Sequence, residues 1–191
     1  MLFVLSLYMR VRAWRWADFG LVKLQGWRAW LMLVLRVLLT IGVMALSVIA
    51  VRYGAKALGF DLMTQATQGM TDRFKNIPGS LPHYLLWMGI VWTSAAFGEE
   101  MFFRGFLITR LQTVFRGLPW AVVLAIIVSA TMFGGMHVYY EGLQGLIMTG
   151  TIALAFGSMF VLFKRNLWPL IIVHGLVDSA GITATFMNWS T

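Results

Sequence analysis

The chain has 191 residues, of which 60% are hydrophobic and 12% are charged, too few to cover a water-exposed surface, so its composition argues against a soluble globular domain. The net charge of +8 comes from short basic clusters between apolar runs and does not indicate nucleic-acid binding. Because the chain has no cysteine, thiol nucleophiles, disulfides and thiolate metal sites are excluded, and its chemistry has to come from His, Glu, Asp or Ser.

The first 30 residues are expected to lie at a membrane surface. Residues 1–9 are apolar but too short to span a bilayer, and they lack the basic flank and cleavage site of a signal peptide. They are either the end of a first membrane helix or a short interfacial helix. Residues 10–30 mix arginine, lysine and tryptophan, which is typical of a segment among lipid headgroups. Residues 1–30 are therefore interpreted as an interfacial segment or the remnant of a first membrane helix.

Five apolar stretches follow, each long enough to cross a bilayer as a helix. They are residues 31–51, 84–109, 119–138, 143–163 and 167–187. One substantial connection, residues 52–83, has the glycine, proline and mixed charges of a water-exposed loop. The expected fold is all-α: a polytopic transmembrane helical bundle of five to six spans over residues 31–191, with an interfacial N-terminal segment.

The connections indicate how the bundle sits in the membrane. Basic residues recur in alternate short connections, at Arg110, Arg116, Lys164 and Arg165. Positive charge is retained on the cytoplasmic side, so the basic N-terminal segment is expected in the cytoplasm. The chain shows no internal repeat and no second domain, and membrane lipid is its expected surroundings, in a bacterial cytoplasmic membrane.

Six acidic, basic or histidine side chains fall inside the last four apolar stretches. They are Glu99, Glu100, Arg104, His137, His174 and Asp178. An ionised side chain at the bilayer centre costs about 2.5 to 3.5 kcal/mol on insertion scales, so six of them are hard to keep without mutual pairing. We therefore expect these side chains to converge on one interior cavity.

Helical spacing divides these residues into patches. Glu100 and Arg104 are four apart and share a helix face, which is most simply explained as an ion pair that holds the helix. Glu99 points about 100° away from Glu100, so it is left free for chemistry. The two other pairs spaced by four are Phe133 with His137 and His174 with Asp178. A lone histidine could be a packing residue, but two histidines with surplus carboxylates favour function.

Several proteolytic patterns are absent. The sequence has no H-E-x-x-H of a zinc protease, no G-x-S-x-G elbow and no pair of intramembrane aspartates. Ser179 follows Asp178 directly, and adjacent helical residues point apart, so these two cannot form a nucleophile and base pair. Serine chemistry is disfavoured.

Three motifs, on the second, third and fifth apolar stretches, resemble those of one protease family. E-E-x-x-x-R at 99–104, F-x-x-x-H at 133–137 and H-x-x-x-D at 174–178 resemble the CPBP family, which includes the type II CAAX prenyl endopeptidases and bacterial Abi proteins. The catalytic core suggested by this resemblance covers residues 84–180, about half of the chain. The resemblance implies an intramembrane endopeptidase that acts on a peptide or protein, lipidated or leader-bearing.

The resemblance also implies a role for each motif residue. Glu99 would be the general base that activates water, and His137 would hold that water. His174 and Asp178 would stabilise the tetrahedral oxyanion. Prenyl endopeptidases carry Asn where this chain has Asp178, and an ionised Asp would repel an oxyanion, so Asp178 is expected to orient His174 or to be protonated. The supporting residues would be Glu100, Arg104 and Phe133.

Two alternatives concern the cofactor, and two concern the course of the helix that carries His137. A glutamate-activated water needs no cofactor, but the ligand set Glu99, His137, His174 and Asp178 is chemically adequate for zinc. Counted along straight helices, His137 would lie near the opposite membrane face from Glu99 and His174. The helix is therefore expected either to break at Gly134 and Gly135 or to begin outside the bilayer and tilt.

Two other functions remain to be weighed against proteolysis. One is a non-catalytic membrane scaffold, or a bacteriocin-immunity or abortive-infection protein, that uses the polar cluster only for packing. The other is a small transporter, since intramembrane Glu and His residues also build proton relays; the absence of an inverted repeat argues against it.

Overall fold

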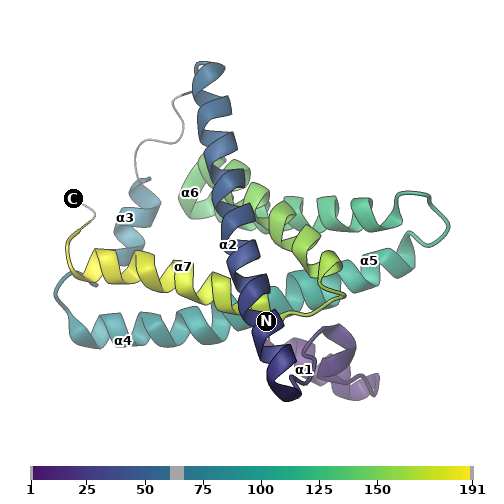
Figure 1. The fold of residues 1–191 in the computed structure, drawn as a ribbon. Coiled ribbons are helices and arrows are strands. Elements are labelled where there is room, and N and C mark those ends of the chain that lie inside the picture. The colour runs from purple at the N-terminus through teal and green to yellow at the C-terminus, as the bar shows by residue number, and fades with distance from the viewer. Residues whose placement is uncertain (1, 61–66, 190–191) are drawn as a thin grey trace.

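The computed structural model describes residues 2–60 and 67–189, which form helices and connections without a strand (Figure 1). The helices are α1 (Leu2–Val11), η1 (Trp16–Phe19), α2 (Gly26–Ala57), α3 (Gln68–Phe74), α4 (Leu81–Ile90), η2 (Val91–Ile108), α5 (Thr109–Val114), α6 (Ala121–Leu162) and α7 (Trp168–Phe186). The predicted all-α class is confirmed. Three of the described helices, α2, α6 and α7, are long and apolar enough to cross a membrane.

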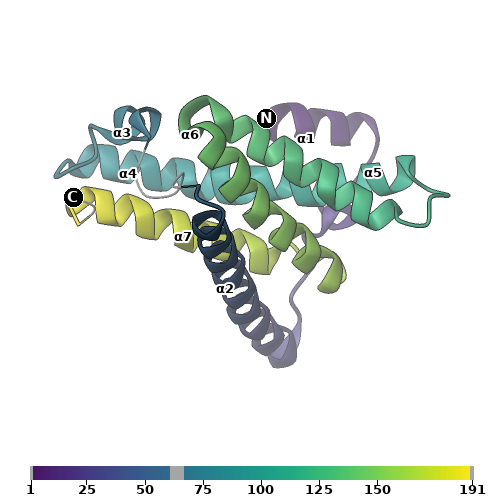
Figure 2. The same ribbon diagram turned by 90° about the horizontal axis from the view of Figure 1, so that it is seen from above.

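One long helical run forms the centre of the fold. α4, η2 and α5 follow one another without a break, with right-handed helical dihedrals at both junctions. α7 lies beside the α4 end of this run, and α2 crosses over α7, as the two views agree (Figures 1 and 2). α6 packs against both η2 and α2. His174 on α7 and His137 on α6 therefore lie on helices that pack against η2.

The middle of this run is wound differently from the sequence-based expectation. Residues 84–109 were predicted as an ordinary α-helix, but Val91–Ile108 is a π-helix, with hydrogen bonds from each residue to the fifth along the chain. Ser129 of α6 donates a hydrogen bond to the carbonyl of Phe103 at 3.0 Å, so this backbone oxygen also has a partner on a second helix. Helical periodicity does not distinguish π from α winding, and π segments often occur at functional sites.

The break in α6 lies eight residues later than Gly134. Residues 121–141 and 143–162 are two helical arms that meet at Gly142, whose φ of 63° and ψ of −154° belong to a region that only glycine adopts readily. The predicted break at Gly134 and Gly135 is wrong, since both remain helical. A Cβ on Gly134 would lie 2.6 Å from the Leu146 carbonyl oxygen. Gly134 therefore permits close packing of the two arms, a common use of glycine in membrane helices.

Replacing Gly142 with alanine is expected to destabilise the protein by about 1 to 3 kcal/mol, because its backbone conformation is strained for any residue with a Cβ. The added methyl group meets no atom within 4 Å, so the cost comes from the backbone alone. Thermal unfolding in detergent measures the effect. Gly135→Ala is the matched control: its methyl group is also uncrowded, the backbone is helical, and stability is expected to be unchanged or slightly higher. Equal stability of the two variants would contradict the strain argument.

The predicted water-exposed loop over residues 52–83 is in part helical. α2 continues to Ala57, α3 occupies Gln68–Phe74, and Ile77 is fully buried; residues 61–66 lie outside the described residues. The Thr67 hydroxyl caps α3 by accepting from the Met70 N–H at 3.3 Å, and it also donates to the Tyr140 carbonyl oxygen at 2.5 Å. This docking on α6 is a long-range contact that composition does not reveal.

The N-terminal segment packs on the core. Leu5, Met9 and Phe19 are buried, and the Arg110 guanidinium lies 4.0 Å from the centre of the Trp14 ring. The cation and the aromatic ring attract one another, which ties the segment to the end of the long helical run. Its position at the membrane interface stays a prediction.

Candidate active site

A cavity of about 350 Å³ lies among η2, α6 and α7, with residues of α2, α3 and α4 completing its wall. All seven site residues predicted from the sequence line it. They are Glu99, Glu100, Arg104, Phe133, His137, His174 and Asp178. The first arm of α6 packs along the long helical run, which places the end of this arm beside the middle of the run (Figure 2). This placement resolves the distance that straight spans put between His137 and Glu99.

Glu100 is the centre of a buried ionic network. Its Oε1 atom accepts a hydrogen bond from Arg104 Nη1 at 2.9 Å and lies 2.8 Å from His174 Nδ1. The side chains of Glu100 and Arg104 are 0% and 2% exposed, so the pair is removed from solvent. The predicted ion pair is therefore present. Its link to His174 was not foreseen, because spacing along one helix does not reveal which residue a second helix brings.

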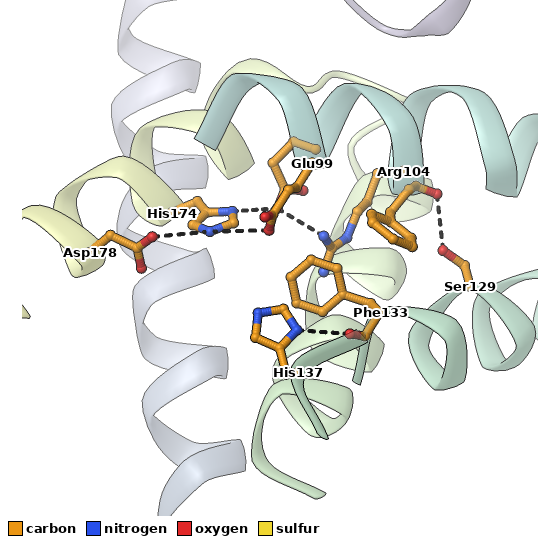
Figure 3. A network of polar contacts seen from close by, with 9 residues as sticks. Glu99, Arg104, Ser129, Phe133, His137, His174 and Asp178 are labelled. Atoms are coloured by element: carbon orange, nitrogen blue, oxygen red, sulfur yellow. Dashed lines mark hydrogen bonds and ion pairs between the residues drawn. The ribbon is translucent and has the colours of Figure 1, made fainter. Parts of the chain in front are cut away.

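Arg104 is enclosed by aromatic rings. Its guanidinium lies 4.6 Å from the centre of the Phe133 ring and 5.4 Å from that of Phe156. The ring faces attract the cation and exclude water from it. Arg104 is therefore held as a counter-ion of Glu100 and is not presented to a ligand (Figure 3).

Glu99 has a different environment from its neighbour. Its side chain is 24% exposed, and Oε2 lies 3.9 Å from His174 Nε2, longer than a strong hydrogen bond. The same His174 nitrogen lies 3.5 Å from Asp178 Oδ2, whose side chain is 37% exposed. Figure 3 shows the three side chains facing one another across the space between η2 and α7. His174 Nε2 is therefore surrounded by carboxylate oxygens but not tightly bound to either.

The ring of His137 is fixed by the turn of helix before it. Its Nδ1 lies 2.8 Å from the Phe133 carbonyl oxygen, which can only accept, so Nδ1 carries the proton. In a neutral ring Nε2 is then an acceptor. The Phe133 ring packs against His137 at a tilt of 39° with 4.7 Å between ring centres, so the F-x-x-x-H spacing supplies both a carbonyl and a packing surface.

Three further ionisable residues that the motifs did not identify line the cavity: Arg73, Tyr140 and Glu141. Arg73 lies in a segment that was predicted to be a loop, and the other two precede the break at Gly142. A weak signal was present, since an aromatic and acidic cluster stands at the end of an apolar stretch. Only the fold brings Arg73 to the same place.

The cavity contains side chains of the types that bind metal ions. Within residues 2–60 and 67–189, no group of three or more His, Asp or Glu side chains is arranged to hold one. His174 Nδ1 already faces Glu100 at 2.8 Å, so this nitrogen is not open to a metal. Nε2 of His137, Nε2 of His174 and the carboxylates of Glu99 and Asp178 remain as donors. The zinc alternative therefore depends on ligands that would have to move.

The model of one protein family, described as "Type II CAAX prenyl endopeptidase Rce1-like", matches residues 81–180, just over half of the chain. The match begins at the first residue of α4 and ends within α7, so it includes all three motifs and every predicted site residue. No curated protein and no solved structure matches the chain.

Proposed function

The chain belongs to the Rce1-like type II CAAX prenyl endopeptidase family, a family of membrane proteases, and from this premise we propose that it hydrolyses a peptide bond with a water activated by Glu99. The observation that carries the proposal is the difference between the two adjacent glutamates. Glu100 is neutralised by Arg104 and bound to His174, whereas Glu99 faces the cavity without a close partner. A carboxylate in that position is available to take a proton.

In the proposed reaction Glu99 removes a proton from water, and the resulting hydroxide attacks the carbonyl carbon of the scissile bond. The carbonyl oxygen becomes an oxyanion in the tetrahedral intermediate. Glu99 then passes its proton to the nitrogen of the leaving amine, the C–N bond breaks, and a carboxylic acid and an amine are released. His137 Nε2, an acceptor, holds the second hydrogen of the attacking water.

His174 is proposed to stabilise the oxyanion. Glu100 accepts from Nδ1 and fixes the ring, while Nε2 is within 4 Å of two carboxylates without a short hydrogen bond to either. An oriented N–H donor without a short hydrogen bond can donate to the oxyanion as negative charge develops there. Asp178, which is more exposed, then orients Nε2 instead of binding the intermediate itself.

The membrane arrangement and the substrate belong to the same proposal. The proposed spans are α2, the run α4–η2–α5, the two arms of α6, and α7, with the basic N-terminal segment in the cytoplasm of a bacterial cell. The substrate is a peptide or protein, prenylated or leader-bearing, that reaches the cavity from the cytoplasmic side or from the lipid.

The purified protein in detergent is expected to cleave a prenylated synthetic peptide, and to keep its rate after dialysis against a strong chelator. Mass spectrometry of the products identifies the bond that is cut. A zinc peptidase treated in parallel serves as the control, since it loses activity under the same dialysis. Loss of cleavage that added zinc restores would replace the Glu99 mechanism with a metal-dependent one. Absence of cleavage from a panel of prenylated and leader-bearing peptides would refute the proposed activity.

A further inference from the structure

Arg73 brings to the cavity a cation that the proposed mechanism does not use. It lies on α3 and lines the same cavity as Glu99. The other arginine of the cavity, Arg104, is already paired with Glu100 at 2.9 Å. Among the residues that the structure describes, no carboxylate lies within 4.0 Å of the Arg73 guanidinium. Its charge is therefore available to a ligand of the cavity.

Aromatic rings hold this guanidinium in place. Its carbon lies 4.3 Å from the centre of the Tyr140 ring, 5.2 Å from that of Trp87 and 5.7 Å from that of Phe74. A planar guanidinium against ring faces keeps its N–H groups at the edges, where they can donate. Two parallel N–H donors match the two oxygens of a carboxylate. The chemistry of the position therefore favours a carboxylate as the ligand.

The segment that carries Arg73 is docked closely on α6. The hydroxyl of Thr67, just before α3, donates to the Tyr140 carbonyl oxygen at 2.5 Å, and a Cβ on Gly69 would lie 2.5 Å from the same oxygen. α3 lies beside the turn of α6 in both overall views (Figures 1 and 2). Since Gly69 leaves no space at this contact, Arg73 is held at a fixed place relative to the first arm of α6.

We infer that Arg73 determines substrate specificity by binding a carboxylate of the peptide that is cut at Glu99. The inference rests on the proposed function, because it takes a peptide as the ligand of the cavity. At about 350 Å³ the cavity is near the lower end of the size range of ligand pockets. Only a short peptide segment therefore fits between Glu99 and Arg73. Glu141 also lines the cavity and would repel an entering anion, so entry depends on the charge of Arg73.

Two sources of carboxylate are compatible with this site: the free end of a chain and an acidic side chain near it. Three prenylated peptides that differ only at the C-terminus distinguish the two sources: one ends in a carboxylate, one ends in a carboxamide, and one ends in a carboxamide with aspartate as its last residue. Binding is measured by fluorescence anisotropy to the Glu99→Gln protein, in which the peptide stays intact. The carboxylate peptide is expected to bind about ten- to a hundredfold more tightly than the carboxamide, as charge-assisted hydrogen bonds do. Recovery of affinity with the aspartate peptide assigns the site to an acidic side chain, and no recovery assigns it to a chain end.

The variant that tests the role of Arg73 is Arg73→Gln in the Glu99→Gln background. The preference for carboxylate over carboxamide is expected to fall to within about twofold, whereas Lys75→Gln, which removes a cation from the end of α3 outside the cavity, keeps the preference. If Arg73→Gln does not fold, Arg73→Lys is the second variant, because lysine keeps the charge without the two parallel N–H donors. Its preference for carboxylate over carboxamide is expected to be reduced but present.

Two outcomes would overturn the inference. One is equal affinity of the Glu99→Gln protein for the acid and the amide, including no binding of either. The other is a preference that survives in Arg73→Gln. Failure of the proposed function gives a different result: the wild-type protein cuts none of these peptides, while the Glu99→Gln protein still binds the carboxylate peptide more tightly than the carboxamide.

Discussion

Glu99→Gln is expected to lower the rate constant for peptide cleavage by about a thousandfold or more, while the protein still folds and binds its peptide. The amide is nearly the size of the carboxylate but cannot take a proton, so the variant loses the general base and with it about 10²- to 10⁴-fold in rate, together with proton delivery to the leaving amine. Glu99 has no short ion pair in the described structure, so little stability depends on its charge. Steady-state kinetics on a prenylated peptide gives kcat and KM separately, and the loss is expected in kcat.

Asp178→Asn is the control variant for the loss of kcat in Glu99→Gln. Asp178→Asn keeps a polar group at the same cavity and, in the proposed mechanism, changes only the orientation of His174, so its loss of kcat is expected to be much smaller. Cleavage by Glu99→Gln at the wild-type rate would refute the mechanism. A cellular effect that survives in Glu99→Gln without any cleavage would favour the non-catalytic scaffold.

Glu100→Gln is expected to have the largest effect on stability, a loss of about 3 to 5 kcal/mol. The substitution leaves the Arg104 guanidinium, which is 2% exposed, without its carboxylate partner in a site from which water is excluded. It also removes the charged acceptor of His174 Nδ1. Chemical unfolding in mixed micelles, followed by tryptophan fluorescence, measures the free energy of unfolding.

The double variant Glu100→Gln/Arg104→Met tests whether the unpaired charge causes the loss. Replacing both members of a buried pair by groups of similar size is often neutral, so much of the lost stability is expected to return. Glu99→Gln is the matched control for removal of one carboxylate from the same helix, and it is expected to be near the wild type. A Glu100→Gln protein as stable as the wild type would show that Arg104 does not depend on this partner.

Composition and periodicity determined the class of the protein. Apolar stretches separated by basic connections predicted an all-α membrane protein, because the chain lacks the charge to cover itself in water. The three motifs indicated the family. Their polar residues stand out in the sequence because polar side chains are costly among apolar helices unless they interact. The pairing of Glu100 with Arg104 also followed from their spacing of four on one helix.

Tertiary structure decided everything that depends on which helices meet. The packing of α6 and α7 on η2 and of α3 on α6 brings His137, His174 and Arg73 to the cavity of Glu99. Sequence spacing reports only the direction of a side chain around its own helix axis. Contacts between helices depend on packing and on the backbone dihedrals of a few glycines. The sequence does not distinguish the glycines of α6 that permit close packing from the one that breaks the helix, because this depends on the neighbours and dihedrals of each.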